Sequence, residues 1–194
     1  NNAKSEFKDR GSKFYGFALK TTNKKEFNEW LQKSKSKFPD ATHHCYAYVL
    51  HPDRSEQYDT DDGEPSNSAG KPILRAINSF QATQIAVIVV RYYGGVNLGI
   101  PGLINAYGEA AKLAIEKAMP VKKDIEEIYE AHCPFGQESQ WYGLINNVII
   151  KILAQKTEAN GYWARFSIPK AKSRELKGLL NQLFSITVTF KHFL

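Results

Sequence analysis

Cysteine, methionine and long apolar runs are all scarce in this chain of 194 residues. It contains one methionine and two cysteines, Cys45 and Cys133, which lie far apart in the sequence. Two cysteines are too few for a disulfide scaffold, and this sparing use is typical of a reducing compartment, so we expect a cytoplasmic protein. The longest apolar run, 85–90 (IAVIVV), is far shorter than the roughly 20 residues of a membrane-spanning helix, so we expect no membrane contact.

A secretory signal is also lacking, since no basic stretch followed by an apolar one opens the chain. The chain begins with Asn1 rather than Met, and we expect residues that precede it to be missing. Hydrophobic residues make up 42% of the chain and charged residues 24%, which excludes a disordered or low-complexity protein. The length suffices to bury a core without a metal or disulfide.

The charge is unevenly distributed along the chain. The formal net charge is +6, but the segment 53–64 carries six acidic residues and one arginine. Basic residues form two clusters: Lys33, Lys35 and Lys37, and then Lys170, Lys172, Arg174 and Lys177. This balance permits an anionic partner such as RNA without requiring one. The two clusters are the best candidates for non-specific RNA contact, but such clusters are more often solvated helix faces.

The first 120 residues show mixed helix and strand patterns. Strands are expected over 14–19, 43–50 and 85–91, and helices over 24–38, 73–80 and 101–119. Between them, 51–72 is expected to be a long polar loop, and loops of that length are usually functional or mobile. Alternation in the second strand places Cys45 in the core and leaves His44, Tyr46 and Tyr48 on the opposite, exposed face.

The chain after Pro120 has a different pattern, which divides the sequence into an N-terminal domain over 1–120 and a C-terminal domain over 121–194. Expected strands at 125–133, 150–157, 162–168 and 186–190 alternate with helices near Trp141 and at 171–183. The dipeptide Asn160-Gly161 predicts a tight hairpin between the second and third of these strands. The order βαββαβ predicts a ferredoxin-like α+β fold.

Three segments have compositions too specific for ordinary connectors. They are Asp61–Pro72 (DDGEPSNSAGKP), Val89–Gly99 (VVRYYGGVNLG) and Pro101–Glu109 (PGLINAYGE). Together with the pair His44-Cys45 and the ferredoxin-like pattern of the second half, they resemble the signatures of the YigZ/IMPACT family. The resemblance covers essentially the whole chain and is closest to the two-domain bacterial members.

This resemblance implies a fold class and a cellular role. It implies an N-terminal two-layer α/β domain similar to domain IV of elongation factor G and to a ribosomal-protein-like fold. It also implies a cytoplasmic role connected with translation, because eukaryotic IMPACT proteins bind the ribosome-associated activator of a translation-initiation-factor kinase. The chain has Asn67-Ser68 where relatives often have Gly-Thr, and we expect the loop shape to persist because asparagine tolerates left-handed backbone. It also has Ile100-Pro101 where some relatives have small residues.

The segment Arg91–Gly95 has the residue types of an anion site. Its glycines leave backbone N–H groups accessible to a phosphate, the following helix offers a positive N-terminus, and the arginine can grip two oxygens. Its tyrosines are suited to stacking on unpaired bases. The candidate binding residues are Arg91, Tyr92, Tyr93, Gly94, Gly95, His44 and Lys71.

A structural interpretation of the same residues stays open. In it the glycines form a tight turn, the tyrosines pack under the long loop, and Arg91 pairs with Asp61, Asp62 or Glu64, because a loop rich in carboxylates needs cationic partners.

The acidic motif loop formed by Asp61, Asp62, Gly63 and Glu64 has carboxylates close enough to hold Mg²⁺, but no phosphate-binding loop pattern accompanies them. A nucleophile pair formed by His44 and Cys45 fails because neighbouring strand residues point to opposite faces. We therefore expect no catalytic residue, metal or cofactor. The predicted function is a non-enzymatic binding protein whose partner is RNA, the ribosome or a translation-associated protein. The alternative is a hydrolase, metal-dependent or not, that acts through the acidic motif loop.

Overall fold

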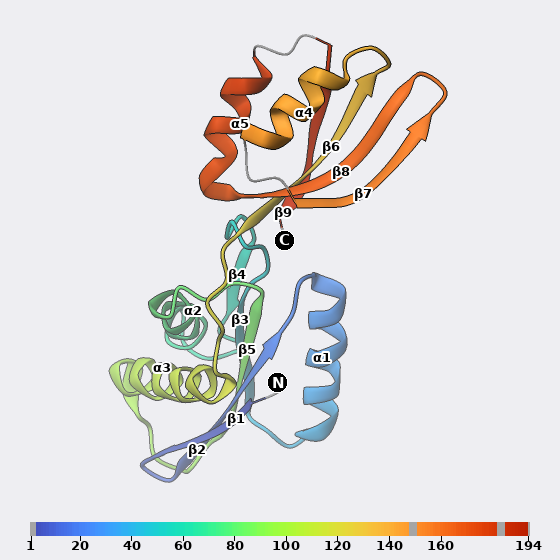
Figure 1. The fold of residues 1–194 in the computed structure, drawn as a ribbon. Helices are drawn as coiled ribbons and strands as arrows, with labels where there is room; N and C mark the ends of the chain where they lie inside the picture. Colours follow the sequence, from blue (N-terminus) through green and yellow to red (C-terminus); the bar gives the residue numbers. More distant parts are fainter. Residues whose placement is uncertain (1–2, 148–150, 182–184, 194) are drawn as a thin grey trace. The chain divides into compact units, whose positions relative to one another are not determined.

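The computed structural model describes residues 3–147, 151–181 and 185–193. The chain forms two compact units, Asn1–Val121 and Lys122–Leu194, and each contains its own sheet (Figure 1). None of the described helices is long and apolar enough to cross a membrane.

The N-terminal unit is built on a five-stranded antiparallel sheet in the order β1-β2-β5-β3-β4. Its central strand β5 carries the apolar run predicted from the sequence, and the end of β5 brings Arg91 opposite Phe14 of β2 and His43 of β3. The strands are β1 (Ala3–Asp9), β2 (Ser12–Lys20), β3 (His43–Val49), β4 (Gln57–Thr60) and β5 (Ile85–Tyr92).

Helices cover both faces of this sheet, so the expectation of a two-layer domain is wrong. Helix α1 (Lys24–Lys37) covers one face, and α2 (Gly70–Ser79) and α3 (Gly99–Ala118) cover the other (Figure 1). The physical reason lies in β5, where Val87 and Val89 pack towards α2 and α3 while Ile88 and Val90 pack towards α1. A strand that is apolar on both faces needs a cover on each.

The layer formed by α1 also corrects the expectation that His44 and Tyr48 lie on an exposed face. His44 is only 7% exposed, and the ring of Tyr48 is buried against Phe27 of α1, with ring centroids 5.0 Å apart. The amphipathic stripe of α1 was recognisable in the sequence, but the sheet face that it covers was not.

Two elements of the N-terminal unit were not expected. Strand β1 pairs with β2 through a tight turn in which Arg10 and Gly11 both have positive φ (44° and 82°), which matches a two-residue hairpin turn. Strand β4 lies within the segment expected to be a loop and pairs with β3. Helix α2 begins at Gly70, three residues before the predicted start.

The C-terminal unit contains a four-stranded antiparallel sheet in the order β7-β8-β6-β9. The chain order is β-α-β-β-α-β, as predicted, with a short 3₁₀ helix (Lys170–Lys172) before α5. The start of the expected strand 150–157 and the end of the expected helix 171–183 lie outside the described residues. The elements are β6 (Glu126–Pro134), α4 (Glu138–Asn147), β7 (Lys151–Glu158), β8 (Gly161–Pro169), α5 (Ser173–Leu180) and β9 (Thr187–Phe193).

Close contact between β2 and α3 depends on Gly16. A Cβ atom added at Gly16 would overlap the backbone carbonyl oxygen of Ala110, whereas a Cβ added at Gly108 of the same helix meets nothing within 4 Å. We expect Gly16→Ala to lower the free energy of unfolding by about 2 to 3 kcal/mol, since a packed backbone cannot move aside cheaply. We expect Gly108→Ala to be neutral or to stabilise by up to about 1 kcal/mol. Urea denaturation measures both, and equal stability of the two variants would contradict this account of the packing.

Candidate functional site

The carboxylate of Asp61 organises the acidic motif loop. Its Oδ1 accepts hydrogen bonds from the backbone N–H groups of Ala69 (2.9 Å) and Gly70 (2.8 Å), and its Oδ2 accepts one from the N–H of Asn67 (2.8 Å). Asp61 therefore closes the loop and satisfies the N-terminal amides of α2, where a negative charge is favourable. Asn67 adopts the left-handed conformation (φ 62°).

Asp62 ties the same loop to β3. Its Oδ2 accepts a hydrogen bond from the backbone N–H of His44 (2.7 Å), and its carbonyl oxygen lies 2.8 Å from Nδ1 of His43. The next residue, Gly63, has φ 91°, a backbone conformation that residues other than glycine rarely adopt. The carbonyl of Asp61 accepts a hydrogen bond from the thiol of Cys45 (2.9 Å). The acidic motif loop is thus held against β3 by hydrogen bonds that involve both backbone and side-chain groups.

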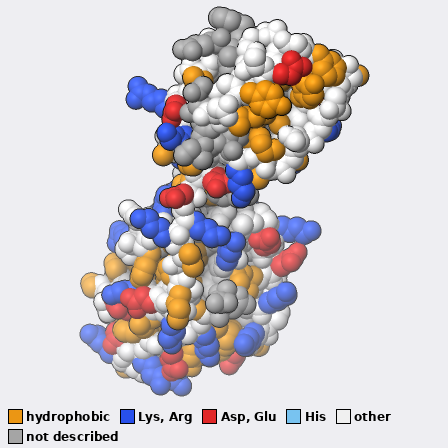
Figure 2. Space-filling model, in the orientation of Figure 1, with side chains coloured by type: hydrophobic (Ala, Val, Ile, Leu, Met, Phe, Trp, Pro, Cys, Tyr) orange, Lys and Arg blue, Asp and Glu red, His pale blue; other side chains and the backbone are white. Residues whose placement is uncertain are grey.

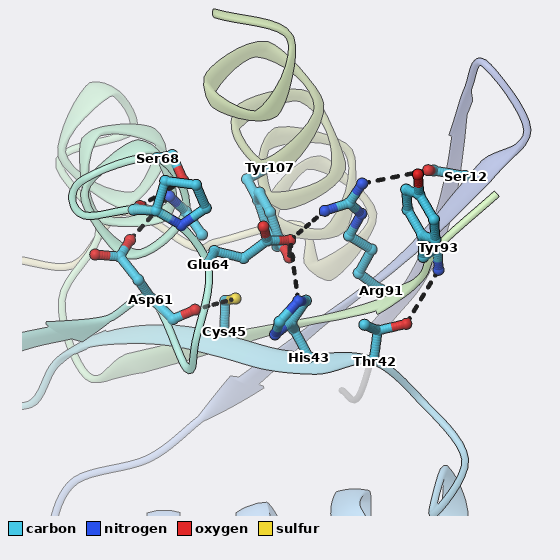
Figure 3. A network of polar contacts seen from close by, with 12 residues as sticks. Ser12, Thr42, His43, Cys45, Asp61, Glu64, Ser68, Arg91, Tyr93 and Tyr107 are labelled. Atoms are coloured by element: carbon cyan, nitrogen blue, oxygen red, sulfur yellow. Dashed lines mark hydrogen bonds and ion pairs between the residues drawn. The ribbon is translucent and has the colours of Figure 1, made fainter. Parts of the chain in front are cut away.

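Glu64 is the carboxylate that pairs with Arg91. Its Oε1 accepts hydrogen bonds from Nη1 of Arg91 (2.6 Å) and from the hydroxyl of Tyr107 on α3 (2.7 Å), and Nε2 of His43 lies 3.8 Å away (Figure 3). The side chains of Arg91 and Glu64 are 6% and 3% exposed. The positive charge of Arg91 is therefore neutralised inside the unit, away from solvent.

The guanidinium of Arg91 is also enclosed by rings. It lies 5.5 Å from the ring centre of Phe14 and 5.5 Å from that of Tyr93, and its Nη2 is 3.4 Å from Oγ of Ser12. The same Ser12 oxygen accepts a hydrogen bond from the backbone N–H of Gly94 (3.1 Å). Arg91 thus supports the turn that follows β5 from beneath.

This turn carries the exposed part of the motif. Tyr93 is 48% exposed, Val96 50% and Ile100, in the first turn of α3, 53%. We call these three residues the 93–100 patch. Tyr93 is held in place by a hydrogen bond from its N–H to Oγ1 of Thr42 (3.1 Å) and one from its hydroxyl to Asn97 (3.2 Å). The patch is apolar and rests on a fixed backbone.

The two glycines of the turn have different surroundings. A Cβ added at Gly94 would overlap backbone atoms of Gly11 in the β1–β2 hairpin, so only glycine permits this approach. Gly95 has φ 84° with open space around its Cα. The hairpin therefore abuts the turn at Gly94 and leaves Gly95 free on the surface.

The side chains of three predicted binding residues lie outside this network, although the backbone N–H of His44 joins it through Asp62. His44 is buried on the α1 side of the sheet, and this burial lowers the pKa of its imidazole. Tyr92 donates a hydrogen bond from its hydroxyl to Asp40 (2.9 Å), and Lys71 forms an exposed ion pair with Asp59 (2.8 Å). The residues that do come together are Arg91, Tyr93, Gly94, Asp61, Asp62, Gly63 and Glu64.

Sequence reasoning missed several members of the network. Tyr107 lies in the third motif segment, and its place in a helix whose apolar stripe is predicted to face the core was the available signal. Ser12 and Thr42 stand in unremarkable contexts, and no local pattern marked them. They join the site only because β2 and β3 both pair with β5.

Chemical reactivity at this site is suppressed by burial. Burial raises the pKa of the Cys45 thiol and that of the Tyr107 hydroxyl, so both stay protonated at neutral pH. Among the described residues, no group of three His, Cys, Asp or Glu side chains is arranged to hold a metal ion. The arrangement is suited to holding backbone segments together.

The buried ion pair is expected to be a major contributor to the stability of the N-terminal unit. Replacing Glu64 by Gln leaves the guanidinium of Arg91 buried without its counter-charge, and we expect a loss of about 3 to 5 kcal/mol in the free energy of unfolding. Asp59→Asn, which removes the carboxylate that pairs with the half-exposed Lys71, should cost less than about 1 kcal/mol. Chemical denaturation of both variants measures the difference, and a negligible effect of Glu64→Gln would contradict the proposed support of the turn.

The thiols are expected to be inert in the folded protein. Burial raises the pKa of both Cys45 and Cys133, so little thiolate is present at pH 8. Iodoacetamide at pH 8 should label neither cysteine in the native chain and both in urea, as followed by mass spectrometry. Rapid labelling of native Cys45 would show an accessible thiolate and would favour a nucleophilic role.

Comparisons with a family model and with known relatives indicate the same family. The model of the Impact N-terminal domain matches residues 10–115. An IMPACT family member from Haemophilus influenzae is 35% identical over 151 residues, which cover 77% of this chain and 73% of the relative. The IMPACT family member YigZ from Escherichia coli is 32% identical over 171 residues, which cover 87% of this chain and 83% of the relative.

The fold is shared with a solved structure. The crystal structure of a hypothetical protein superposes with a TM-score of 0.64 at 27% sequence identity, covering 96% of this chain and 92% of the other. This match extends over both units. With the N-terminal match to the family model and the bacterial relatives covering most of its length, the chain belongs to the IMPACT family, in its two-domain bacterial type.

Proposed function

We propose that this chain is a binding protein without a catalytic centre, and that its 93–100 patch docks onto a protein of the translation apparatus. The observation that carries this proposal is the contrast at the end of β5. Arg91 and Glu64 neutralise each other inside the unit, while Tyr93, Val96 and Ile100 remain exposed. Exposed apolar and aromatic side chains above a fixed backbone are typical of protein-docking surfaces.

A protein partner is favoured over RNA at this patch. The phosphate site expected at Arg91 requires an accessible guanidinium, and that group is buried against Glu64 and between two rings. One side of the Tyr93 ring is also occupied by Arg91, which leaves less of it for a stacked base. If RNA or the ribosome is the partner, we expect the two basic clusters, at 33–37 and 170–177, to make the contacts.

The turn beneath the patch is preorganised for docking. Its backbone is fixed by Thr42 through Tyr93, by Ser12 through Gly94, and by the close contact between Gly94 and Gly11. A rigid surface loses little conformational entropy on binding, which favours affinity. In this proposal Arg91, Glu64 and the acidic motif loop are positioning residues that hold the patch.

The link with translation rests on the resemblance to the IMPACT family. We infer that the C-terminal unit is ferredoxin-like, which its strand order β7-β8-β6-β9 supports, and that the N-terminal unit is related to domain IV of elongation factor G. A cytoplasmic location is also part of the proposal, and the two buried free cysteines support it.

The hydrolase alternative has one observation in its favour. His43 is partly exposed and its Nε2 lies 3.8 Å from Glu64, and a histidine beside a carboxylate is a common general-base arrangement. However, Oε1 of Glu64 already accepts two short hydrogen bonds, and both carboxylate oxygens of Asp61 accept hydrogen bonds from backbone N–H groups. A turnover screen with added divalent metals, with Asp62→Asn as control, tests this alternative.

Charges placed on the patch should abolish docking. We expect the double variant Val96→Glu and Ile100→Glu to lose co-purification with translation-associated proteins by at least tenfold, because a carboxylate buried without a partner opposes association. Affinity capture from a lysate of the source organism, treated with nuclease and analysed by mass spectrometry, measures this. The unfolding midpoint should stay unchanged, since both side chains are about half exposed.

A matched control is Met119→Glu, which alters another exposed apolar residue of the same unit and should leave docking intact. The proposal fails if capture disappears on nuclease treatment and falls steeply with salt, because that result identifies RNA as the partner. It also fails if metal-stimulated turnover is found and is lost in Asp62→Asn.

A further inference from the structure

The C-terminal unit contains a pocket that the family match over residues 10–115 does not include. It lies between α4 and the β7–β8 hairpin and has a volume of about 410 Å³, within the range of small-ligand sites. Figure 2 shows hydrophobic side chains gathered on this unit with an acidic side chain beside them. The lining residues that matter for its chemistry are Glu138, Trp141, Tyr142, Lys156, Tyr162 and Trp163.

Glu138 supplies a carboxylate without a cationic partner. It stands at the first residue of α4, and its Oε1 accepts a hydrogen bond from the backbone N–H of Gly136 (3.1 Å). Hydrogen bonds from its own N–H, from that of Gly136 and from the Tyr162 hydroxyl lower the pKa of Glu138, so the carboxylate is ionised at neutral pH. Across the described part of the chain, no Lys, Arg or His lies within ion-pair distance of it.

The basic residue of the pocket is already paired. The ammonium of Lys156 lies 2.8 Å from the carboxylate of Glu158 and 5.1 Å from the ring centre of Trp163. Arg165 approaches the same ring at 5.6 Å and forms its ion pair with Glu130 (2.6 Å). The charge left unmatched in the pocket is therefore the negative charge of Glu138.

Aromatic rings surround this charge. Trp141 is buried with its ring against Phe166 of the core, at 6.0 Å between centroids, while Tyr142 is largely exposed at the pocket. Tyr162 packs edge-on against Phe135, at 5.2 Å, and reaches Glu138 through its hydroxyl. Ring faces attract cations through their quadrupole, and a nearby carboxylate adds a direct charge interaction.

We propose that this pocket binds an organic cation, a guanidinium or alkylammonium group on an apolar body, with the cation against Glu138 and the apolar body against Trp141, Tyr142 and Tyr162. The site is independent of the 93–100 patch and does not rest on the proposed docking function. A neutral aromatic ligand would leave Glu138 desolvated without a partner, which disfavours it. An anion would meet the same unmatched carboxylate.

The test uses two nearly isosteric probes that differ in charge, N-acetyl-arginine amide and N-acetyl-citrulline amide. We expect the full chain to bind the arginine compound at least about tenfold more tightly in isothermal titration calorimetry, with amide shifts in two-dimensional NMR confined to α4, β7 and β8. Glu138→Gln should remove this preference, and Tyr142→Ala, at an exposed ring, should weaken binding without unfolding the chain. Glu175→Gln, an exposed carboxylate of α5, should leave binding unchanged.

Comparison with agmatine identifies the source of the cation. Tighter binding of agmatine than of N-acetyl-arginine amide assigns the pocket to a free small cation, and the reverse assigns it to a basic side chain of a peptide. Equal affinity for the arginine and citrulline compounds overturns the proposal. The proposal is also overturned if none of the three probes binds, or if the preference for the arginine compound survives in Glu138→Gln.

Discussion

The N-terminal unit depends on one buried ion pair, that between Glu64 and Arg91. It joins the acidic motif loop to the end of the central strand, and through Tyr107 and Ser12 it reaches α3 and β2. Burying two charges is costly, and this cost is offset only where geometry is good and further hydrogen bonds are made. The short contact to Glu64, the contact to Ser12 and the rings on either side of the guanidinium offset part of this cost, while Nε of Arg91 is buried without a hydrogen-bond partner.

This interaction determines what the molecule presents to a partner. Because Glu64 neutralises Arg91 inside the unit, the turn above this pair exposes Tyr93, Val96 and Ile100 rather than the guanidinium. The C-terminal unit shows the opposite arrangement, with an unpaired carboxylate, Glu138, at a pocket lined by aromatic rings. The two units thus offer surfaces of different chemistry, one apolar and one suited to cations.

The expectation that His44 and Tyr48 are exposed was wrong because the pattern of one strand does not show what packs against it. Alternation along β3 correctly separated Cys45 from His44, but an alternating pattern does not reveal whether the second face is covered. The position of α1 decided that: Tyr48 is buried against Phe27, and His44 is buried as well. The residue types around Arg91 fit both a phosphate site and an internal ion pair, and the sequence left both open; the structure shows an ion pair with Glu64 at 2.6 Å.

The sequence by itself determined the elements and their order, because apolar periodicity, glycine turns and the Asn160-Gly161 hairpin are local properties. It also determined the family, since each motif segment, the one around Glu64 and the one around Arg91, is a continuous stretch of sequence that can be recognised without the structure. The tertiary structure alone decided that Ser12, Glu64, Arg91 and Tyr107 meet, that α1 adds a third layer, and that Glu138 lies beside aromatic rings. Those contacts join residues distant in sequence, and they arise only when strands pair and helices pack.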